Sequence, residues 1–325
     1  MPLLTASTPR TTRRSRQAAA GADSPAITDT TVRKRSRRKT TSSSVYALPR
    51  ILRVISPTIK VLGVDFGITL TSALLLVASK IVFHYVFVYH LGWPLGLPKN
   101  PTEDSIAALV SVTHSTLLLF PLGSLLLGHQ KDPVARERDA PSKNWYLLAD
   151  SLIQFCTGYM IQDFILILVK DYDDAIGGIF PFRLVGEDPL FLAHHVATVL
   201  YMSQCRHLKA GHYSAMLLMF FGELSNPFQN SWFIGKWCLE SGVSAMTDSF
   251  FARNYIIIGK LFAFTYGVLR LIIGPFVGLF IMGSLFKERG RKRIGLANSL
   301  LWSLMIVGVM VGSIPFAFTV ALGRE

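Results

Sequence analysis

The chain has 325 residues, of which 50% are hydrophobic and only 16% are charged. Soluble domains average about 25% charged residues, so this chain lacks the charge that a water-exposed surface needs. Its net charge of +13 is uneven, because residues 1–60 hold 13 basic residues and two acids, a net of +11, which leaves +2 for the other 265 residues. The composition therefore argues against a nucleic-acid partner and indicates a basic tail on a membrane-embedded body.

Residues 1–55 form the tail, which we predict to be a disordered basic arm in the cytosol. The arm contains "TTRRSR" and "VRKRSRRKTTSSS" and almost no long apolar side chains, so it cannot bury enough surface to offset its ordering entropy. It has no apolar core of a secretory signal, and an organelle transit peptide is the alternative interpretation. We expect the arm to lie against anionic lipid head groups, where each cation contributes on the order of 1 kcal/mol.

Seven apolar runs follow, and a helix needs about 20 such residues to cross a bilayer. They lie near 66–88, 105–127, 147–169, 189–204, 213–233, 257–283 and 295–318. With the N-terminus in the cytosol, the segments on the inner side carry 24 Lys and Arg and those on the outer side carry 6, as the positive-inside rule requires. The predicted fold is all-α: a polytopic membrane helix bundle of about seven transmembrane helices over residues 60–320, around a polar-lined cavity.

Polar side chains interrupt these runs, and such residues usually face the bundle interior and mark functional sites. In chain order the candidates are His114, Asp163, His194, His195, Thr198, Glu223, Asn226, Asn230 and Arg270. We expect them to converge on one functional cavity. The alternative is a set of interhelical hydrogen bonds worth about 0.6 kcal/mol each, with no further function.

Spacing sharpens this expectation in two places. Glu223, Asn226 and Asn230 stand at i, i+3 and i+7, so they share one helix face. Pro227 removes a backbone donor beside them and predicts a kink. The adjacent His194 and His195 point about 100° apart on a helix, so one can face the bundle centre while the other faces a neighbouring helix.

Cysteine and histidine spacing points away from metal chemistry. Cys156, Cys205 and Cys238 are far apart and form no paired motif, so we interpret them as small buried apolar residues. The eight histidines are scattered, without the clustered boxes that a di-iron centre needs. We therefore expect neither a metal nor a cofactor.

Three segments together resemble the TLC domain, the multi-pass module of ceramide synthases, translocon-associated relatives and lipid-regulatory membrane proteins: "TGYMIQDFILIL", "HHVATVLYMSQCR" and "GELSNPFQNSWF". His114 and "LRLIIGP" also match family positions. The resemblance implies a bundle around a lipid-binding cavity, usually in the endoplasmic reticulum. In ceramide synthases a double His and a downstream His-Asp are associated with acyl transfer. Here His194 and His195 match the first element, but Gly222 and Glu223 stand where His-Asp is expected, as in plant-type members that lack the complete motif.

Two functions follow from this comparison. The first is a protein that binds or senses lipid and acts in membrane lipid homeostasis, including that of sphingolipids, with membrane lipids as partners and self-association allowed. The second is an acyl-CoA-dependent N-acyltransferase of ceramide-synthase type, in which acyl-CoA is a substrate. There His194, His195 and Glu223 are the catalytic candidates, with one histidine as base and Asn226 or Asn230 donating to the oxyanion. A cargo receptor is a third class that the sequence does not directly support.

Overall fold

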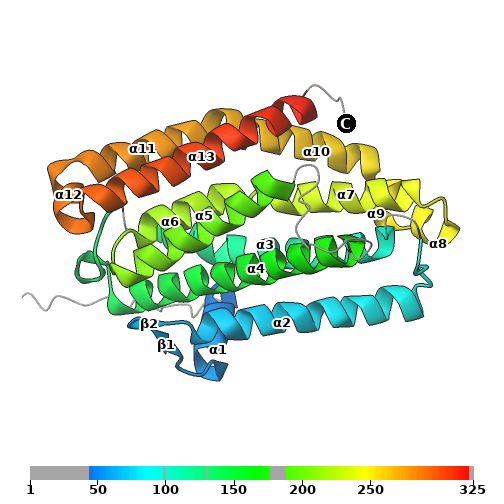
Figure 1. Ribbon diagram of the computed structural model, residues 1–325, viewed down its shortest axis with the longest axis horizontal. Helices are drawn as coiled ribbons and strands as arrows, with labels where there is room; N and C mark the ends of the chain where they lie inside the picture. The colour runs from blue at the N-terminus through cyan, green and yellow to red at the C-terminus, as the bar shows by residue number, and fades with distance from the viewer. Residues whose placement is uncertain (1–43, 98–99, 129–130, 176–187, 322–325) are drawn as a thin grey trace, which may run out of the picture. The chain divides into compact units, whose positions relative to one another are not determined.

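The computed structural model describes residues 44–97, 100–128, 131–175 and 188–321, which are almost entirely α-helical (Figure 1). Residues 1–43 of the expected arm lie outside the described residues. Residues 44–55 are described: the 3-10 turn η1 (Ser44–Tyr46) leads into α1 (Ala47–Ile55). Leu52 of α1 is fully buried in the hydrophobic core, so this part of the segment is anchored to the bundle.

The first half of the bundle contains a short antiparallel hairpin and four long helices. Its elements are β1 (Lys60–Val61), β2 (Val64–Asp65), α2 (Gly67–His84), the π-helix η2 (Tyr85–His90), α3 (Pro101–Gly128), the 3-10 turn η3 (Glu137–Asp139), α4 (Lys143–Ala175) and α5 (Asp188–His207).

The second half is helical throughout its described length. Its elements are α6 (His212–Glu223), α7 (Asn226–Glu240), α8 (Ser244–Thr247), α9 (Phe250–Arg253), α10 (Tyr255–Gly267), the π-helix η4 (Val268–Ile273), α11 (Gly274–Phe286), α12 (Glu288–Ile294) and α13 (Leu296–Ala321).

Four helical segments of the described chain are long and apolar enough to cross a membrane. They are Gly67–His90, Pro101–Leu127, Tyr255–Phe286 and Leu296–Phe318, and each coincides with a predicted span. Their outward side chains include Leu74, Phe264 and Leu304, which are 60%, 69% and 69% exposed, as expected of a lipid-facing surface. The three other predicted spans lie in α4, α5 and the α6–α7 pair, so the count of seven stays a prediction.

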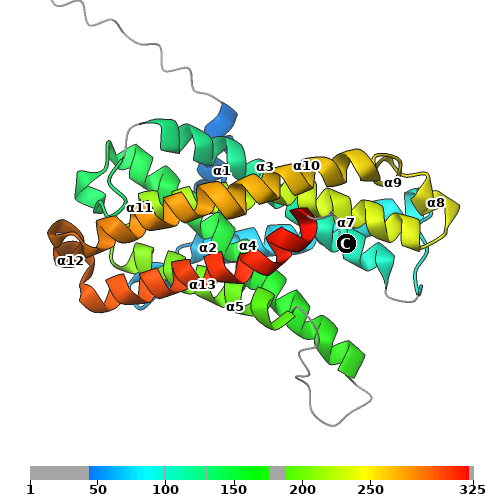
Figure 2. The ribbon, with the colours of Figure 1, turned by 90° about the horizontal axis from the view of Figure 1, so that it is seen from above.

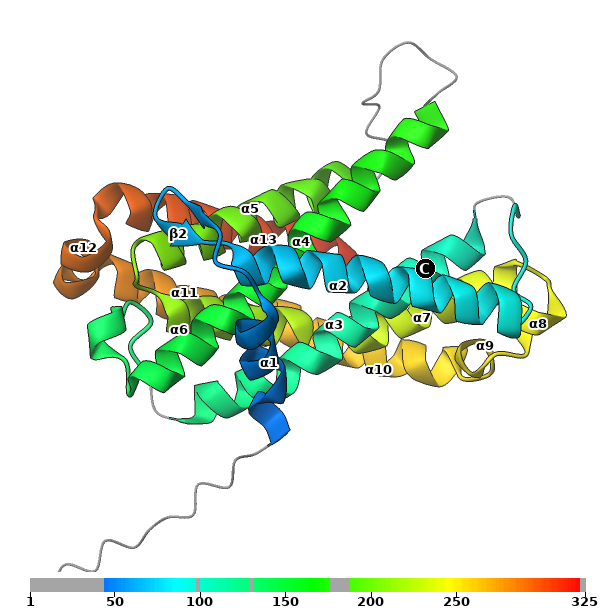
Figure 3. The same ribbon diagram turned by 90° about the horizontal axis from the view of Figure 1, so that it is seen from below.

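The helices pack in pairs around α4 and α6. Contacts join α2 to α4, α3 to α6 and α7, and α11 to α13. Figure 2, seen from above, shows α11 and α13 nearest the viewer, and Figure 3, seen from below, shows α2 nearest the viewer. Close approach of α2 to α4 needs Gly158, because a Cβ there would lie 2.5 Å from the Thr69 carbonyl oxygen. Trp302 of α13 is fully buried, and its Nε1 donates to Gln204 Oε1 of α5 at 2.6 Å.

The predicted fifth span is broken where the sequence suggests. Helix α6 ends at Glu223 and α7 begins at Asn226, with Pro227 in the first turn of α7. A proline is tolerated there because the first-turn N–H groups have no partner within the helix. The two linking residues, Leu224 and Ser225, keep right-handed helical backbone angles, so the interruption is short, and it sets Glu223 at a helix end. The kink expected from Pro227 stays a prediction.

Candidate functional site

Glu223 lies at the centre of a buried polar network. The residue is 3% exposed, and its Oε2 accepts hydrogen bonds from Ser115 Oγ at 2.7 Å and from Asn226 Nδ2 at 2.8 Å. The three side chains come from α6, α3 and α7, so the network ties three helices together. A buried carboxylate is stabilised by such bonds, since an unpaired one costs far more than a neutral group.

His114 lies beside this carboxylate without a direct bond to it. The residue is 0% exposed, and its ring stacks on Tyr159 at 4.0 Å between centroids and packs against Phe155 at 5.0 Å. Its Nδ1 is 3.8 Å from Glu223 Oε2, which is too long for a hydrogen bond. Neither ring nitrogen has a hydrogen-bond partner among the described residues.

A second set of hydrogen bonds extends the network toward α4. Asn230 Nδ2 donates to Ser111 Oγ at 3.0 Å and to the Asn226 carbonyl at 3.0 Å. The Tyr159 hydroxyl donates to the same Ser111 Oγ at 2.8 Å. The predicted face of Glu223, Asn226 and Asn230 is thus used in full, although it spans two helices.

The double histidine on α5 is held by α4. His195 is 2% exposed, and its Nε2 lies 3.0 Å from Asp163 Oδ2. The His194 ring is half-buried and nearly perpendicular to that of His195, at 87° and 5.8 Å between centroids. A carboxylate fixes the orientation of an imidazole, and for His195 this carboxylate is that of Asp163.

Arg270 and Thr198 complete the set of sequence candidates. Arg270 lies in the π-helix η4, where it donates to the Gly222 carbonyl at 3.3 Å and its guanidinium carbon lies 5.3 Å from the centroid of the Tyr266 ring. Such π-helical turns occur frequently at functional sites. Thr198 is half-buried on α5, and no hydrogen bond to another described residue joins its side chain to the network.

The two clusters share one region of the bundle. Asp163 follows Tyr159 by one turn on α4, so both side chains lie on one face of that helix. Glu223 is within electrostatic reach of Arg270 and His195. The structure therefore brings the sequence candidates together, with Thr198 at the edge. Two pockets in the described part of the chain are lined by other residues, so a cavity lined by these groups stays a prediction.

Sequence reasoning missed three members of this network and one neighbouring cluster. Ser111, Ser115 and Tyr159 are the missed members, and the spacing of the two serines around His114 could have indicated a polar face on α3. No group of three or more metal-binding side chains occurs in the described ranges.

The missed cluster lies where α4, α5 and α6 meet. Asp150 Oδ1 accepts from Arg206 Nε at 2.9 Å and lies 3.4 Å from His212 Nε2. Arg206 and His212 are 5% and 3% exposed, although their segment was expected to be a connection at the membrane surface. Arg206 also donates to the Asp65 carbonyl, which joins the hairpin to the bundle.

The described part of the chain consists of long apolar helices around buried polar groups. This arrangement is that of a multi-pass membrane protein. The family model of the TLC domain matches residues 104–316, more than half of the chain, and the chain belongs to the TLC-domain family. No curated protein and no solved structure matches it with significance. The family links the chain to lipid metabolism or lipid sensing, while the plant-type subgroup stays a prediction.

Proposed function

We propose that this protein binds or senses a membrane lipid and acts in membrane lipid homeostasis. The observation that carries the proposal is the buried imidazole of His114 beside the Glu223 carboxylate, because neither ring nitrogen has a hydrogen-bond partner in the described part of the chain. Leaving a buried donor or acceptor unpaired costs about 1–3 kcal/mol. A ligand group with both a donor and an acceptor, such as a lipid hydroxyl or amide, would bridge the 3.8 Å between Nδ1 and Oε2.

The surrounding contacts support a positioned polar ligand. Ser115 and Asn226 hold the carboxylate from one side, while Tyr159 holds the imidazole plane from another. Few, well-placed polar groups in an apolar setting are typical of small-molecule sites. His194, His195 and Arg270 extend the polar region in which the head group would lie.

The test is the lipid composition of cells that contain or lack the protein, together with the lipids that copurify with it. Asn226→Leu should abolish rescue of the lipid profile, because it removes a donor to Glu223. Asn298→Leu is the matched control, since Asn298 is a half-buried helical amide that donates to its own helix at 2.9 Å. Unchanged profiles and the absence of a copurifying lipid would contradict the proposal.

The His195–Asp163 pair favours a second candidate, an acyl-CoA-dependent N-acyltransferase. In that reaction the amine of a sphingoid base attacks the thioester carbonyl, His195 accepts the amine proton, and the thiolate of CoA leaves. Asp163 would hold the imidazole in place. Asn226 and Asn230 already donate to Glu223 and Ser111, so these contacts do not support an oxyanion role for either amide.

Acyl transfer can be measured directly with purified protein, acyl-CoA and a sphingoid base. This candidate predicts turnover by the unmodified protein and loss of turnover in His195→Ala. No turnover with a panel of acyl chain lengths would remove the enzyme hypothesis and leave the lipid-binding one intact. For both candidates we propose the endoplasmic reticulum as the location. We also propose a cytosolic N-terminus, which the excess of basic residues in the inner segments supports.

A further inference from the structure

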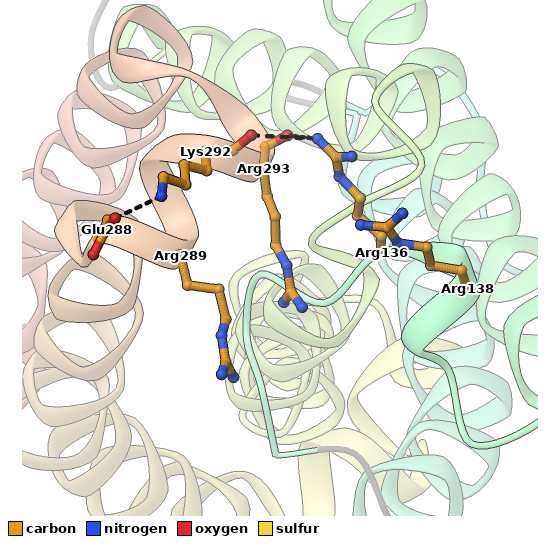
Figure 4. A pocket seen from close by; sticks show the side chains of 6 residues that line it. All are labelled: Arg136, Arg138, Glu288, Arg289, Lys292 and Arg293. Atoms are coloured by element: carbon orange, nitrogen blue, oxygen red, sulfur yellow. Dashed lines mark hydrogen bonds and ion pairs between the residues drawn. The ribbon is translucent and has the colours of Figure 1, made fainter. Parts of the chain in front are cut away.

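Five basic side chains line an open pocket at one end of the bundle. The pocket has a volume of about 370 Å³. Helix α12 forms one wall, and Arg136 together with the 3-10 turn η3 forms the other (Figure 4). The lining residues are Arg136, Arg138, Glu288, Arg289, Lys292 and Arg293.

Two of these cations form short ion pairs within the protein. Arg293 is 16% exposed at its side chain and contacts Asp132 at 2.6 Å and Asp139 at 2.8 Å. Lys292 pairs with Glu288 at 2.6 Å on the same helix. Because Arg293 is clamped by two carboxylates, it fixes the wall of the pocket and is not the group that would take up a ligand.

The other three cations leave positive charge in the pocket. Arg289 lies 4.0 Å from Asp132 at a 75% exposed position, and Arg138 has no ion pair with a carboxylate of the described chain. Arg136 donates to the Arg293 carbonyl at 2.8 Å, while its buried Nε has no hydrogen-bond partner among the residues that the structure describes. Guanidinium groups near one another repel, and a shared anion would relieve that repulsion.

The pocket lies at the membrane–water boundary. Helix α12 connects the spans Tyr255–Phe286 and Leu296–Phe318, and the Arg136 segment follows the span Pro101–Leu127. Phe286 and Leu296, which flank α12, are 40% and 55% exposed. The cations of the pocket are therefore close in sequence to exposed apolar side chains at the ends of these spans, where a membrane-spanning helix would meet the lipid phosphates.

We propose that this pocket binds a multiply phosphorylated head group, either of an anionic lipid in the adjacent leaflet or of a soluble polyphosphate. Arginine forks match phosphate oxygens in pairs, and basic pockets between transmembrane helices bind such head groups. The pocket shares no residue with the His114–Glu223 network, so it is a second site. It does not depend on the proposed function of that network.

The experiment titrates full-length protein in neutral detergent with three probes: dioctanoyl phosphatidylinositol bisphosphate, inositol trisphosphate and dioctanoyl phosphatidylcholine. The two phosphorylated probes should bind saturably and the phosphatidylcholine should not. The double variant R138Q/R289Q should weaken binding about 30-fold, since each of the two lost cations costs on the order of 1 kcal/mol near a head group.

The matched control is K143Q/R291Q, which removes the same charge from exposed residues outside the pocket lining. Both double variants retain the basic N-terminal arm, so binding of the probes to the arm is the same in each. The affinity of the control should match that of the unmodified protein. If phosphatidylinositol bisphosphate binds more tightly than inositol trisphosphate, the result supports the site and assigns it to a lipid. Equal affinities of these two probes support the site and assign it to a soluble polyphosphate. No saturable binding, or equal weakening in both double variants, would overturn the proposal.

Discussion

Replacing His114 by Phe tests whether its imidazole is kept for a ligand. The substitution keeps an aromatic ring against Tyr159 and Phe155, while it removes two nitrogens that have no partner among the described residues. One unpaired buried polar group costs about 1–3 kcal/mol, and the larger phenyl ring offsets part of that gain. His114→Phe should therefore stabilise lipid-free protein by up to about that amount. The same change should abolish stabilisation by added lipid.

The assay is the apparent melting temperature of purified protein in detergent, before and after addition of the copurifying lipids. His212→Phe is the matched control, because His212 is also buried against an aromatic ring, that of Tyr146 at 4.5 Å, but has Asp150 as a partner at 3.4 Å. We expect the control to lose about 1–3 kcal/mol. A lower melting temperature for His114→Phe with an unchanged lipid response would refute the reasoning.

Three further predictions concern the contacts and orientation of the bundle. A double-mutant cycle of Asp163→Ala and His195→Ala should give a coupling free energy of about 0.6–1.7 kcal/mol, measured from the free energies of unfolding in detergent. A value near zero would show that the 3.0 Å contact between His195 and Asp163 contributes nothing to stability. Gly158→Ala should destabilise by about 1–3 kcal/mol because the added Cβ meets α2, whereas Gly308→Ala, with open space around it, should not lower the melting temperature. A glycosylation acceptor inserted in 241–249 should be modified if that segment is lumenal, and an unmodified acceptor there would contradict the proposed orientation.

Much of the helical framework could be predicted because lipid-facing helices are continuous apolar runs. The runs near 105–127 and 295–318 correspond to α3 and α13 within a few residues. Pro227 also indicated a local disturbance of the helix, and α6 and α7 are separate helices on either side of Leu224 and Ser225, because the effect of a proline on the backbone does not depend on tertiary contacts.

Partners across helices could not be predicted in the same way. Spacing places Glu223, Asn226 and Asn230 on one face, but the choice of Asp163 as the partner of His195 depends on how α4 is rotated and shifted against α5. Arg206 shows a similar limit. Its position in a short basic segment suggests exposure, and only the packing of α4 brings the Asp150 carboxylate within 2.9 Å.

An experimental structure of the protein in a lipid nanodisc would test most directly whether this buried network holds a lipid. The account predicts non-protein density within hydrogen-bonding distance of the His114 ring, bridging it to Glu223. An imidazole whose nitrogens are both bonded to protein groups, with no lipid beside it, would contradict the account.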